Sequence, residues 1–269
     1  MKFSLLICVY AKENPQYFSQ CLDSVMAQTV LPDEAVIVKD GPLTAELEQV
    51  LENFRFKNTN IVALPENVTQ GPGRAAGVAA AQNELIAVMD SDDICLPDRF
   101  EKQLEMFRAN PELCLIGGQA AEFRAEPGDM AVRRAVPVSH ADIIRFAKLR
   151  NPFNSMTVMF RRGEALKAGN YRYFPWFEDY DLWARMIKNG AKCANHPDAL
   201  VYARVGAGMY GRRRGRTYIR SEWRMQKTLR DLELISRAEL LRNVLARIPV
   251  RILPPKWLSA VYNTFARRR

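Results

Sequence analysis

Short apolar runs of strand length alternate with amphipathic helical segments through the first hundred residues of the chain. Residues 3–10 form an apolar run, the pattern of a strand buried on both faces of a parallel sheet. Residues 15–28 then place apolar side chains at helical spacing, and residues 35–38 predict the next strand. This order of strand, helix and strand predicts a parallel α/β sheet.

The same alternation continues to residue 109. The predicted helices cover residues 43–54, 72–81 and 98–109, and the predicted strands between them cover residues 60–64 and 85–89. Residues 113–160 are less regular, with one predicted helix near 139–149, and a further helix begins at Glu178. The elements together predict a Rossmann-like, nucleotide-binding α/β/α sandwich, in which ligands bind beyond the carboxyl ends of the strands.

Acidic residues gather where two of the predicted strands end. Asp90, Asp92 and Asp93 follow one strand directly, and Asp40 follows another. Crowded carboxylates repel one another unless a cation or hydrogen-bond donors lie nearby, and an Asp-x-Asp pattern offers the hard oxygen ligands that Mg²⁺ and Mn²⁺ prefer. Helix capping by Asp92 and Asp93, and turn formation by Asp40, would explain the same residues without any ligand.

Four segments, in this order and spacing over about residues 3–205, make the chain resemble the family 2 glycosyltransferases with the GT-A fold. They are ICVYAKENPQYFSQCLDSVMAQT, VIVKDG, AVMDSDDICLPDRFEKQ and FEDYDLWARMIKNG. The last contains Glu178 and Asp179, which could otherwise simply complement the dipole of a helix start. The resemblance is to bacterial enzymes that build O-antigen, capsule or exopolysaccharide repeat units.

The resemblance implies a role for each matching residue. Asp92 is the implied ligand of Mn²⁺ or Mg²⁺, with Asp90 and Asp93 in support. Asp179 is the implied catalytic base, with Glu178 beside it as a group that orients the acceptor. The implied nucleotide pocket consists of Cys8, Val9, Tyr10, Asp40, Arg74, Asp90 and Ser91. Together these imply inverting, metal-dependent transfer of a sugar from a nucleotide sugar, most simply a UDP-sugar, to a hydroxyl of a glycan acceptor.

The chain departs from the family pattern at two positions. Lys39 stands where the family usually has the first of two acids, so a donor contact is lost or replaced by a cation near phosphate. Ser155 stands where similar bacterial members often have histidine. The QxxRW signature of processive synthases is absent from the sequence, which favours transfer of one sugar per encounter.

Charge divides the chain into two parts. The whole chain has 39 Lys and Arg against 30 Asp and Glu, a formal charge of +9. Residues 204–269 hold 17 basic and 4 acidic residues, so residues 1–203 carry a net charge of −4. We therefore expect a GT-A catalytic domain at 1–205, with a nucleotide-sugar half at 1–100 and an acceptor half at 101–205, followed by a basic helical arm at 206–269.

The basic arm has two interpretations. It could contact an anionic membrane surface and a lipid-diphosphate-linked acceptor such as an undecaprenyl-diphosphate glycan, or it could close the fold with a solvated helical face. Basic residues from Arg204 to Arg220 could also touch donor phosphates. Five scattered cysteines and the lack of any apolar stretch long enough for a membrane span favour a cytoplasmic protein, peripheral on the inner face of the bacterial inner membrane.

Two other classes of protein remain as alternatives. Clustered positive charge is permissive for a nucleic-acid-binding module, but no zinc-finger, RNP or helix-turn-helix signature accompanies it, so nucleic acid is not expected as a partner. A sugar-nucleotide nucleotidyltransferase usually has a Gly-rich loop after its first strand, and residues 10–13 (Tyr-Ala-Lys-Glu) are not such a loop.

Overall fold

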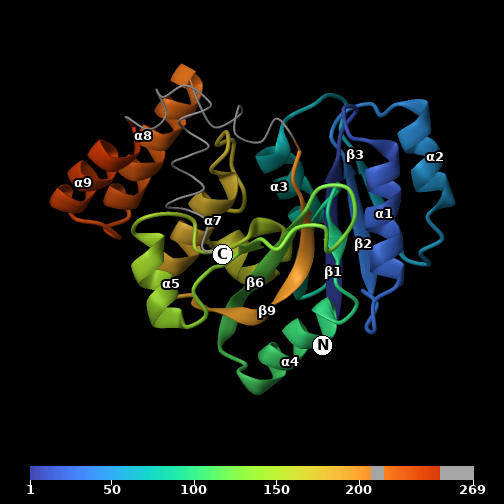
Figure 1. Cartoon of the computed structure of the whole chain (residues 1–269), viewed down its shortest axis with the longest axis horizontal. Helices are drawn as coiled ribbons and strands as arrows, with labels where there is room; N and C mark the ends of the chain where they lie inside the picture. The colour runs from blue at the N-terminus through green and yellow to red at the C-terminus, as the bar shows by residue number, and fades with distance from the viewer. Residues whose placement is uncertain (207–214, 249–269) are drawn as a thin grey trace.

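A computed structural model describes residues 1–206 and 215–248 and shows one mixed β-sheet with helices on both faces (Figure 1). In these ranges the order is β3-β2-β1-β4-β8-β6-β9-β5, and β7 pairs with β6. The strands are β1 (Phe3–Val9), β2 (Glu34–Lys39), β3 (Thr59–Ala63), β4 (Leu85–Asp90), β5 (Ile94–Cys95), β6 (Leu113–Phe123), β7 (Arg133–Arg134), β8 (Met159–Arg161) and β9 (Lys192–Arg204).

The first half of the sheet is the predicted parallel α/β unit. Strands β3, β2, β1 and β4 are all parallel, and β1 lies between β2 and β4. The intervening helices are α1 (Pro15–Met26), α2 (Ala45–Asn53), α3 (Gln70–Ala80) and α4 (Arg99–Ala109). Each predicted element is present, with ends that differ from the predicted ones by at most two residues. The predicted α/β fold is thereby confirmed.

Alternation of buried side chains along β1 divides the core into two layers. Leu5 and Ile7 pack in the cluster that contains α1, α2 and α4, whereas Leu6 packs in the cluster that contains α3 and α7. Both faces of the strand are therefore covered, which is why its sequence is apolar at nearly every position. The helices of the second layer also include α5 (His140–Ala147), α6 (Arg162–Lys167) and α7 (Glu178–Lys188).

The second half of the sheet mixes strand directions. Strand β8 is antiparallel to both of its neighbours, β4 and β6, while β6 and β9 are parallel. A short 3₁₀ turn at Ser155–Thr157 precedes β8. Each of these pairings joins segments that are far apart in the chain, so the irregular sequence of residues 113–160 predicts strands there without their order.

The described C-terminal helices, α8 (Gly215–Asp231) and α9 (Arg237–Arg247), pack against the catalytic body. An aromatic and aliphatic cluster joins them to α7 and the segment before it. Its buried members are Phe174, Phe177, Tyr180, Ala184, Tyr218, Met225, Leu229 and Ile235. Within α8 and α9, the fully buried Glu222 pairs with Arg247, and Asn243 donates to the carbonyl of Lys148 at the end of α5. These two helices thus complete the fold.

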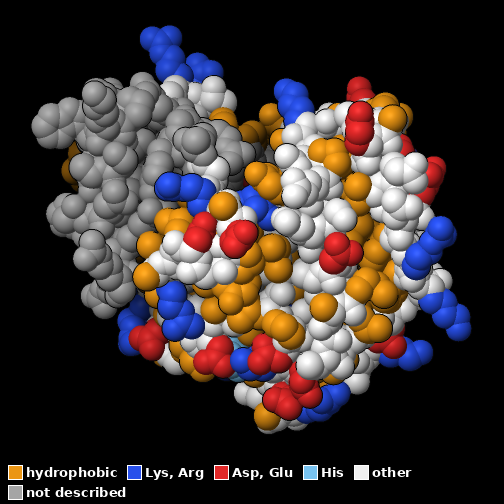
Figure 2. Space-filling model, turned by 45° about the vertical axis from the view of Figure 1, so that its right-hand side comes forward, with side chains coloured by type: hydrophobic (Ala, Val, Ile, Leu, Met, Phe, Trp, Pro, Cys, Tyr) orange, Lys and Arg blue, Asp and Glu red, His pale blue; other side chains and the backbone are white. Residues whose placement is uncertain are grey.

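The most basic parts of the arm, including Arg212, Arg213 and Arg214, lie outside the described residues. On the face of the described protein in Figure 2, acidic and basic side chains are interspersed and neither sign covers a continuous area. No helix among residues 1–206 and 215–248 is long and apolar enough to cross a membrane. All five cysteines are free, as their scattered spacing predicts.

Candidate active site

A cavity of about 1170 Å³ opens at the carboxyl ends of β1, β2 and β4. Every residue that the sequence implies for the site lines this one cavity. They are Cys8, Val9, Tyr10, Asp40, Arg74, Asp90, Ser91, Asp92, Asp93, Glu178 and Asp179. The parallel strands end at one edge of the sheet, and α7 and the segment before it form the opposite wall, so residues 170 positions apart are brought together.

Asp40 is held in a fixed orientation at the end of β2. Its carboxylate accepts hydrogen bonds from the backbone N–H of Val68 (2.7 Å) and from Asn67 Nδ2 (3.0 Å). The next residue, Gly41, has φ +86°, and a Cβ there would lie 2.9 Å from the backbone nitrogen of Asn67. Lys39 pairs with Glu48 of α2 at 2.5 Å, so its ammonium is neutralised by a carboxylate of the protein itself.

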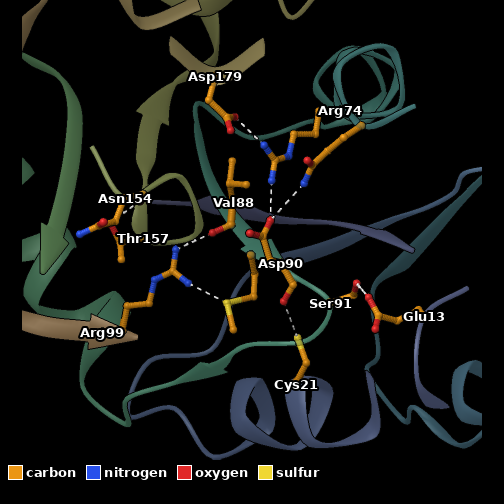
Figure 3. A network of polar contacts seen from close by, with 12 residues as sticks. Glu13, Cys21, Arg74, Val88, Asp90, Ser91, Arg99, Asn154, Thr157 and Asp179 are labelled. Atoms are coloured by element: carbon orange, nitrogen blue, oxygen red, sulfur yellow. Dashed lines mark hydrogen bonds and ion pairs between the residues drawn. The ribbon is translucent and has the colours of Figure 1, made fainter. Parts of the chain in front are cut away.

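Arg74 of α3 is buried between two carboxylates of the site (Figure 3). Its guanidinium donates to Asp90 Oδ1 and to Asp179 Oδ1, each at 2.5 Å. Burial disfavours the cation, but the charges of Asp179 and Asp90 outweigh it and hold the pKa of Arg74 above its usual range. Arg74 therefore links the strand end that carries the Asp-x-Asp motif to the helix that carries the acidic pair.

Two glycines let α3 approach its neighbours closely enough for this link. A Cβ on Gly71 would lie 2.3 Å from the carbonyl oxygen of Arg172, just before the acidic pair. A Cβ on Gly77 would overlap Leu6 of β1, 2.2 Å from its side chain. The small residues of this helix thus set the position of Arg74.

The two acids at the start of α7 have different surroundings. Asp179 faces Arg74, whereas Glu178 is buried beside the negative charge of Asp179. Burial first, and Asp179 second, raise the pKa of Glu178 to about 7. The Gln70 amide donates to Asp90 Oδ1 at 3.4 Å, and when its oxygen and nitrogen are exchanged it instead donates to Glu178 Oε1 at 3.0 Å. With a pKa of about 7, Glu178 is partly protonated near neutral pH.

The turn after β4 presents its acids unequally. Burial, and then the charges of Asp90 and Glu13, raise the pKa of Asp92 to about 6. Burial also raises the pKa of Asp93, whose Oδ1 accepts the backbone N–H of Arg204 at 2.7 Å. Ser91 donates its hydroxyl to Glu13 at 2.5 Å. A neighbouring cation would relieve the repulsion at Asp92, while Asp93 is committed to the backbone.

The donor set fits a metal held jointly with a substrate. No group of three or more His, Cys, Asp or Glu side chains in the described ranges is arranged to hold a metal alone. Mg²⁺ in phosphate-transfer sites is commonly held by one or two carboxylates, with substrate oxygens and waters completing its shell. Asp92 supplies such a carboxylate next to Asp90, so the residues fit a metal that binds together with a diphosphate.

Arg204, at the end of β9, holds the Asp-x-Asp turn in place. Its Nε donates to the backbone carbonyl of Asp92 (2.9 Å), and its Nη2 donates to Gln20 of α1 (2.6 Å). The guanidinium carbon lies 3.8 Å from the centroid of the Tyr17 ring and 4.4 Å from that of Phe123. Sequence reasoning did not find this role, because its partners lie more than 80 residues away in the chain.

Comparison with known proteins identifies the family of the chain. The model of glycosyl transferase family 2 matches residues 4–169, and the chain belongs to this family. It is therefore a glycosyltransferase, and the arrangement of its sheet and helices is the GT-A fold.

Relatives are similar over nearly the whole chain. The chain is 39% identical to the amylovoran biosynthesis glycosyltransferase AmsE of Erwinia amylovora, over 97% of this chain and 98% of that protein. It is 33% identical to an Escherichia coli UDP-Gal:alpha-D-GlcNAc-diphosphoundecaprenol beta-1,3-galactosyltransferase, over 99% and 97%. The crystal structure of S. aureus TarS 1-349 with UDP-GlcNAc superimposes with a TM-score of 0.70 at 17% identity, covering 99% of this chain and 74% of that one.

Proposed function

We propose that this glycosyltransferase transfers a sugar from a UDP-sugar, with inversion and with a divalent metal, to a hydroxyl of an undecaprenyl-diphosphate-linked glycan in bacterial surface polysaccharide synthesis. The observation that carries the proposal is the Arg74 bridge between Asp90 and Asp179, because it puts the donor motif and an acidic pair in one cavity. The substrates in the name of the E. coli relative support the choice of donor and acceptor, and amylovoran synthesis in the Erwinia relative supports a polysaccharide product.

On the donor side, the protein would hold the nucleotide by groups fixed before it arrives. Asp40 would contact the base, the main chain of Cys8–Tyr10 would line the nucleoside, and Asp90 would contact the ribose. Mn²⁺ or Mg²⁺ held by Asp92 would supply positive charge to the leaving diphosphate. Arg74 is a fixed cation within 2.5 Å of Asp90, so it would add charge at the same place without a proton transfer.

On the acceptor side, Asp179 would act as the base. The acceptor hydroxyl forms a bond to the anomeric carbon as the bond from that carbon to the diphosphate breaks, and its proton goes to the carboxylate. Arg74 contacts Oδ1 of Asp179, so we assign the proton to Oδ2. Glu178 would accept or donate a hydrogen bond that orients the acceptor. One displacement inverts the anomeric centre, so an α-linked donor gives a β-linkage.

We also propose that the enzyme works at the cytoplasmic face of the membrane and that residues 206–269 help it bind there. The acceptor class is membrane-linked in the E. coli relative, and the segment is strongly basic. Nucleic-acid binding and nucleotidyl transfer receive no support from the family match.

Transfer by the purified protein tests the proposal. UDP-, GDP- and dTDP-sugars are supplied with Mn²⁺ and with GlcNAc-α-diphosphate carrying an alkyl chain, and the product linkage is read by NMR. We expect a UDP-sugar to be used and a β-linkage to form.

Asp92→Ala and Asp179→Asn should each lower kcat by at least about 10³-fold, whereas Asp198→Asn, on the surface outside the cavity, should match the wild type. Full transfer by Asp179→Asn, or an α-linked product, would contradict the mechanism.

A further inference from the structure

Trp176 has an unusual backbone conformation just before the acidic pair. Its φ is +66°, in the left-handed region that bulky residues rarely adopt. Such a conformation persists only where surrounding contacts enforce it, and it is found most often at functional sites. In Figure 1 the segment that contains Trp176 lies above α7, between α8 and α3.

Trp176 holds the third position of a tight turn in which Pro175 comes second and the Phe177 N–H donates to the Phe174 carbonyl at 2.9 Å. Phe174 and Phe177 are buried in the cluster with α8. Trp176, between them, is 44% exposed and lines the cavity, and its ring centroid lies 5.4 Å from that of Tyr218 of α8. Tyr173, 58% exposed, lines the same cavity. The bend at Trp176 therefore anchors two aromatic side chains in the core and turns a third toward the site.

The position of Trp176 points to the acceptor rather than the donor. It precedes Glu178 by two residues, on the wall formed by α7 and α8, whereas the groups assigned to the nucleotide come from β1, β2, β4 and α3. A sugar whose hydroxyl reaches Asp179 must lie against this wall. The C–H groups on one face of a pyranose ring are apolar, and an indole offers a large rigid apolar surface with a polar N–H at its edge.

We propose that Trp176, backed by Tyr218, is the stacking surface for the pyranose ring of the acceptor sugar. This inference rests on the proposed function, since it assumes that Asp179 receives the acceptor proton. It makes Trp176 a residue that sets acceptor affinity and leaves donor binding unchanged.

Substitution of Trp176 tests the inference with GlcNAc-α-diphosphate-alkyl as the acceptor probe. Trp176→Gly removes the ring and suits the backbone, because glycine adopts φ +66° without strain. We expect the acceptor KM to rise at least tenfold, the KM for the UDP-sugar to stay within twofold, and the Tm not to fall. Trp176→Phe keeps an aromatic face, so its acceptor KM should lie between those of the wild type and Trp176→Gly. Trp223→Ala is the matched control, since Trp223 is 48% exposed on α8 but does not line the cavity.

A second measurement does not depend on the lipid-diphosphate acceptor. Saturation-transfer NMR with methyl glycosides, on protein saturated with UDP and Mn²⁺, should show contact of the sugar ring that is lost in Trp176→Gly and kept in Trp223→Ala. Wild-type protein that contacts glycosides but transfers nothing to the lipid-diphosphate probe would contradict the proposed acceptor and leave the stacking intact. An unchanged acceptor KM and an unchanged NMR signal in folded Trp176→Gly would overturn the stacking alone.

Acceptor probes with short and long alkyl chains separate sugar contact from lipid contact. If Trp176 stacks on the sugar, Trp176→Gly should raise KM by the same factor for both chain lengths. A defect seen only with the long chain would mean that Trp176 contacts the lipid, and the inference would be wrong.

Discussion

The two walls of the cavity are built in different ways. The donor wall, named for its proposed role, consists of the ends of neighbouring parallel strands, β1, β2 and β4, each a short apolar run followed by polar residues. The acceptor wall, also named for its proposed role, consists of irregular segments, the start of α7, and residues of α8 and α9. The first wall is fixed by local sequence, whereas the second depends on contacts between distant parts of the chain. Arg74 joins the two walls, so its substitution tests most directly whether the walls depend on each other.

Of the substitutions that test this comparison of the two walls, Arg74→Gln should have the largest effect. It leaves Asp90 and Asp179 without their shared cation in a buried place, which should cost about 3 kcal/mol of unfolding free energy. Transfer should fall by about 10²–10³-fold, because a fixed charge near the leaving diphosphate is lost. Chemical denaturation measures the loss of stability, and steady-state kinetics measures the loss of transfer.

Arg145→Gln, which removes an exposed ion pair with Asp142, is the control and should leave both quantities near those of the wild type. An equally stable and active Arg74→Gln variant would show that the walls are independent.

The donor wall was largely predictable from the sequence. Apolar runs that end in Asp40 and in Asp90–Asp93 are recognisable because both faces of each strand are buried, and parallel strands bring their ends together. The acidic pair at Glu178 was located by its helix start and by the family resemblance. What no local pattern shows is which charges meet, so the Arg74 bridge and the pairing of Lys39 with Glu48 came only from the structure.

The acceptor wall was less predictable for a physical reason. The insertion of β8 between β4 and β6 depends on strand pairing across about 45 to 75 residues, which leaves no periodic signal. Trp176 stands in a turn closed by the Phe177 N–H and the Phe174 carbonyl, and Pro175 marks that turn in the sequence, but the left-handed third position is usually taken by glycine. The local sequence therefore marks the turn without predicting the conformation of the tryptophan.

Glu178→Gln tests whether the buried carboxylate of Glu178, in the acceptor wall, destabilises the folded protein when it is ionised. Because the pKa of Glu178 is about 7 in the folded protein and near 4.5 when unfolded, the folded state binds the proton more tightly. The contribution of this group to stability is therefore present in full below pH 4.5 and is lost as the pH rises to 7. Glutamine mimics the protonated form, so the variant should exceed the wild type by less than about 1 kcal/mol at pH 5 and by up to about 3 kcal/mol at pH 8.

Urea unfolding at the two pH values measures the difference between Glu178→Gln and the wild type. Glu126→Gln, in an exposed loop, should follow the wild type at both pH values. If Glu178→Gln gains no stability at pH 8, burial of Glu178 does not raise its proton affinity in solution.

Asn243→Ala tests whether α8 and α9 are part of the catalytic domain. The Asn243 amide donates to the carbonyl of Lys148 (2.8 Å) and to Gln226 Oε1 (3.0 Å), and both acceptors would lose a partner. The expected loss is about 2 kcal/mol, in a single unfolding transition with the rest of the chain. Ser236→Gly, which alters only the N-cap of α9, should cost a few tenths of a kcal/mol. Separate transitions for the two parts would show that these helices form an independent unit.

Arg204→Lys should have the smallest effect. It sharpens the comparison most, because Arg204 comes from the end of β9 but its side chain holds the turn after β4, which belongs to the donor wall. Lysine keeps the charge but cannot bond the Asp92 carbonyl and Gln20 together. The position of Asp92 should loosen, and the affinity for Mn²⁺ in the presence of UDP should fall about tenfold, which is about 1.4 kcal/mol. Affinity for UDP without metal should change little. Titration calorimetry measures both constants. Arg161→Lys is the matched control, since Arg161 also donates to two acceptors, the backbone carbonyls of Leu113 and Pro111, but outside the cavity. It should lower the Tm and leave the Mn²⁺ constant unchanged. If Arg204→Lys and Arg161→Lys alter Mn²⁺ binding equally, Arg204 acts through the stability of the whole fold. The structure of the donor wall would then depend on its local sequence alone.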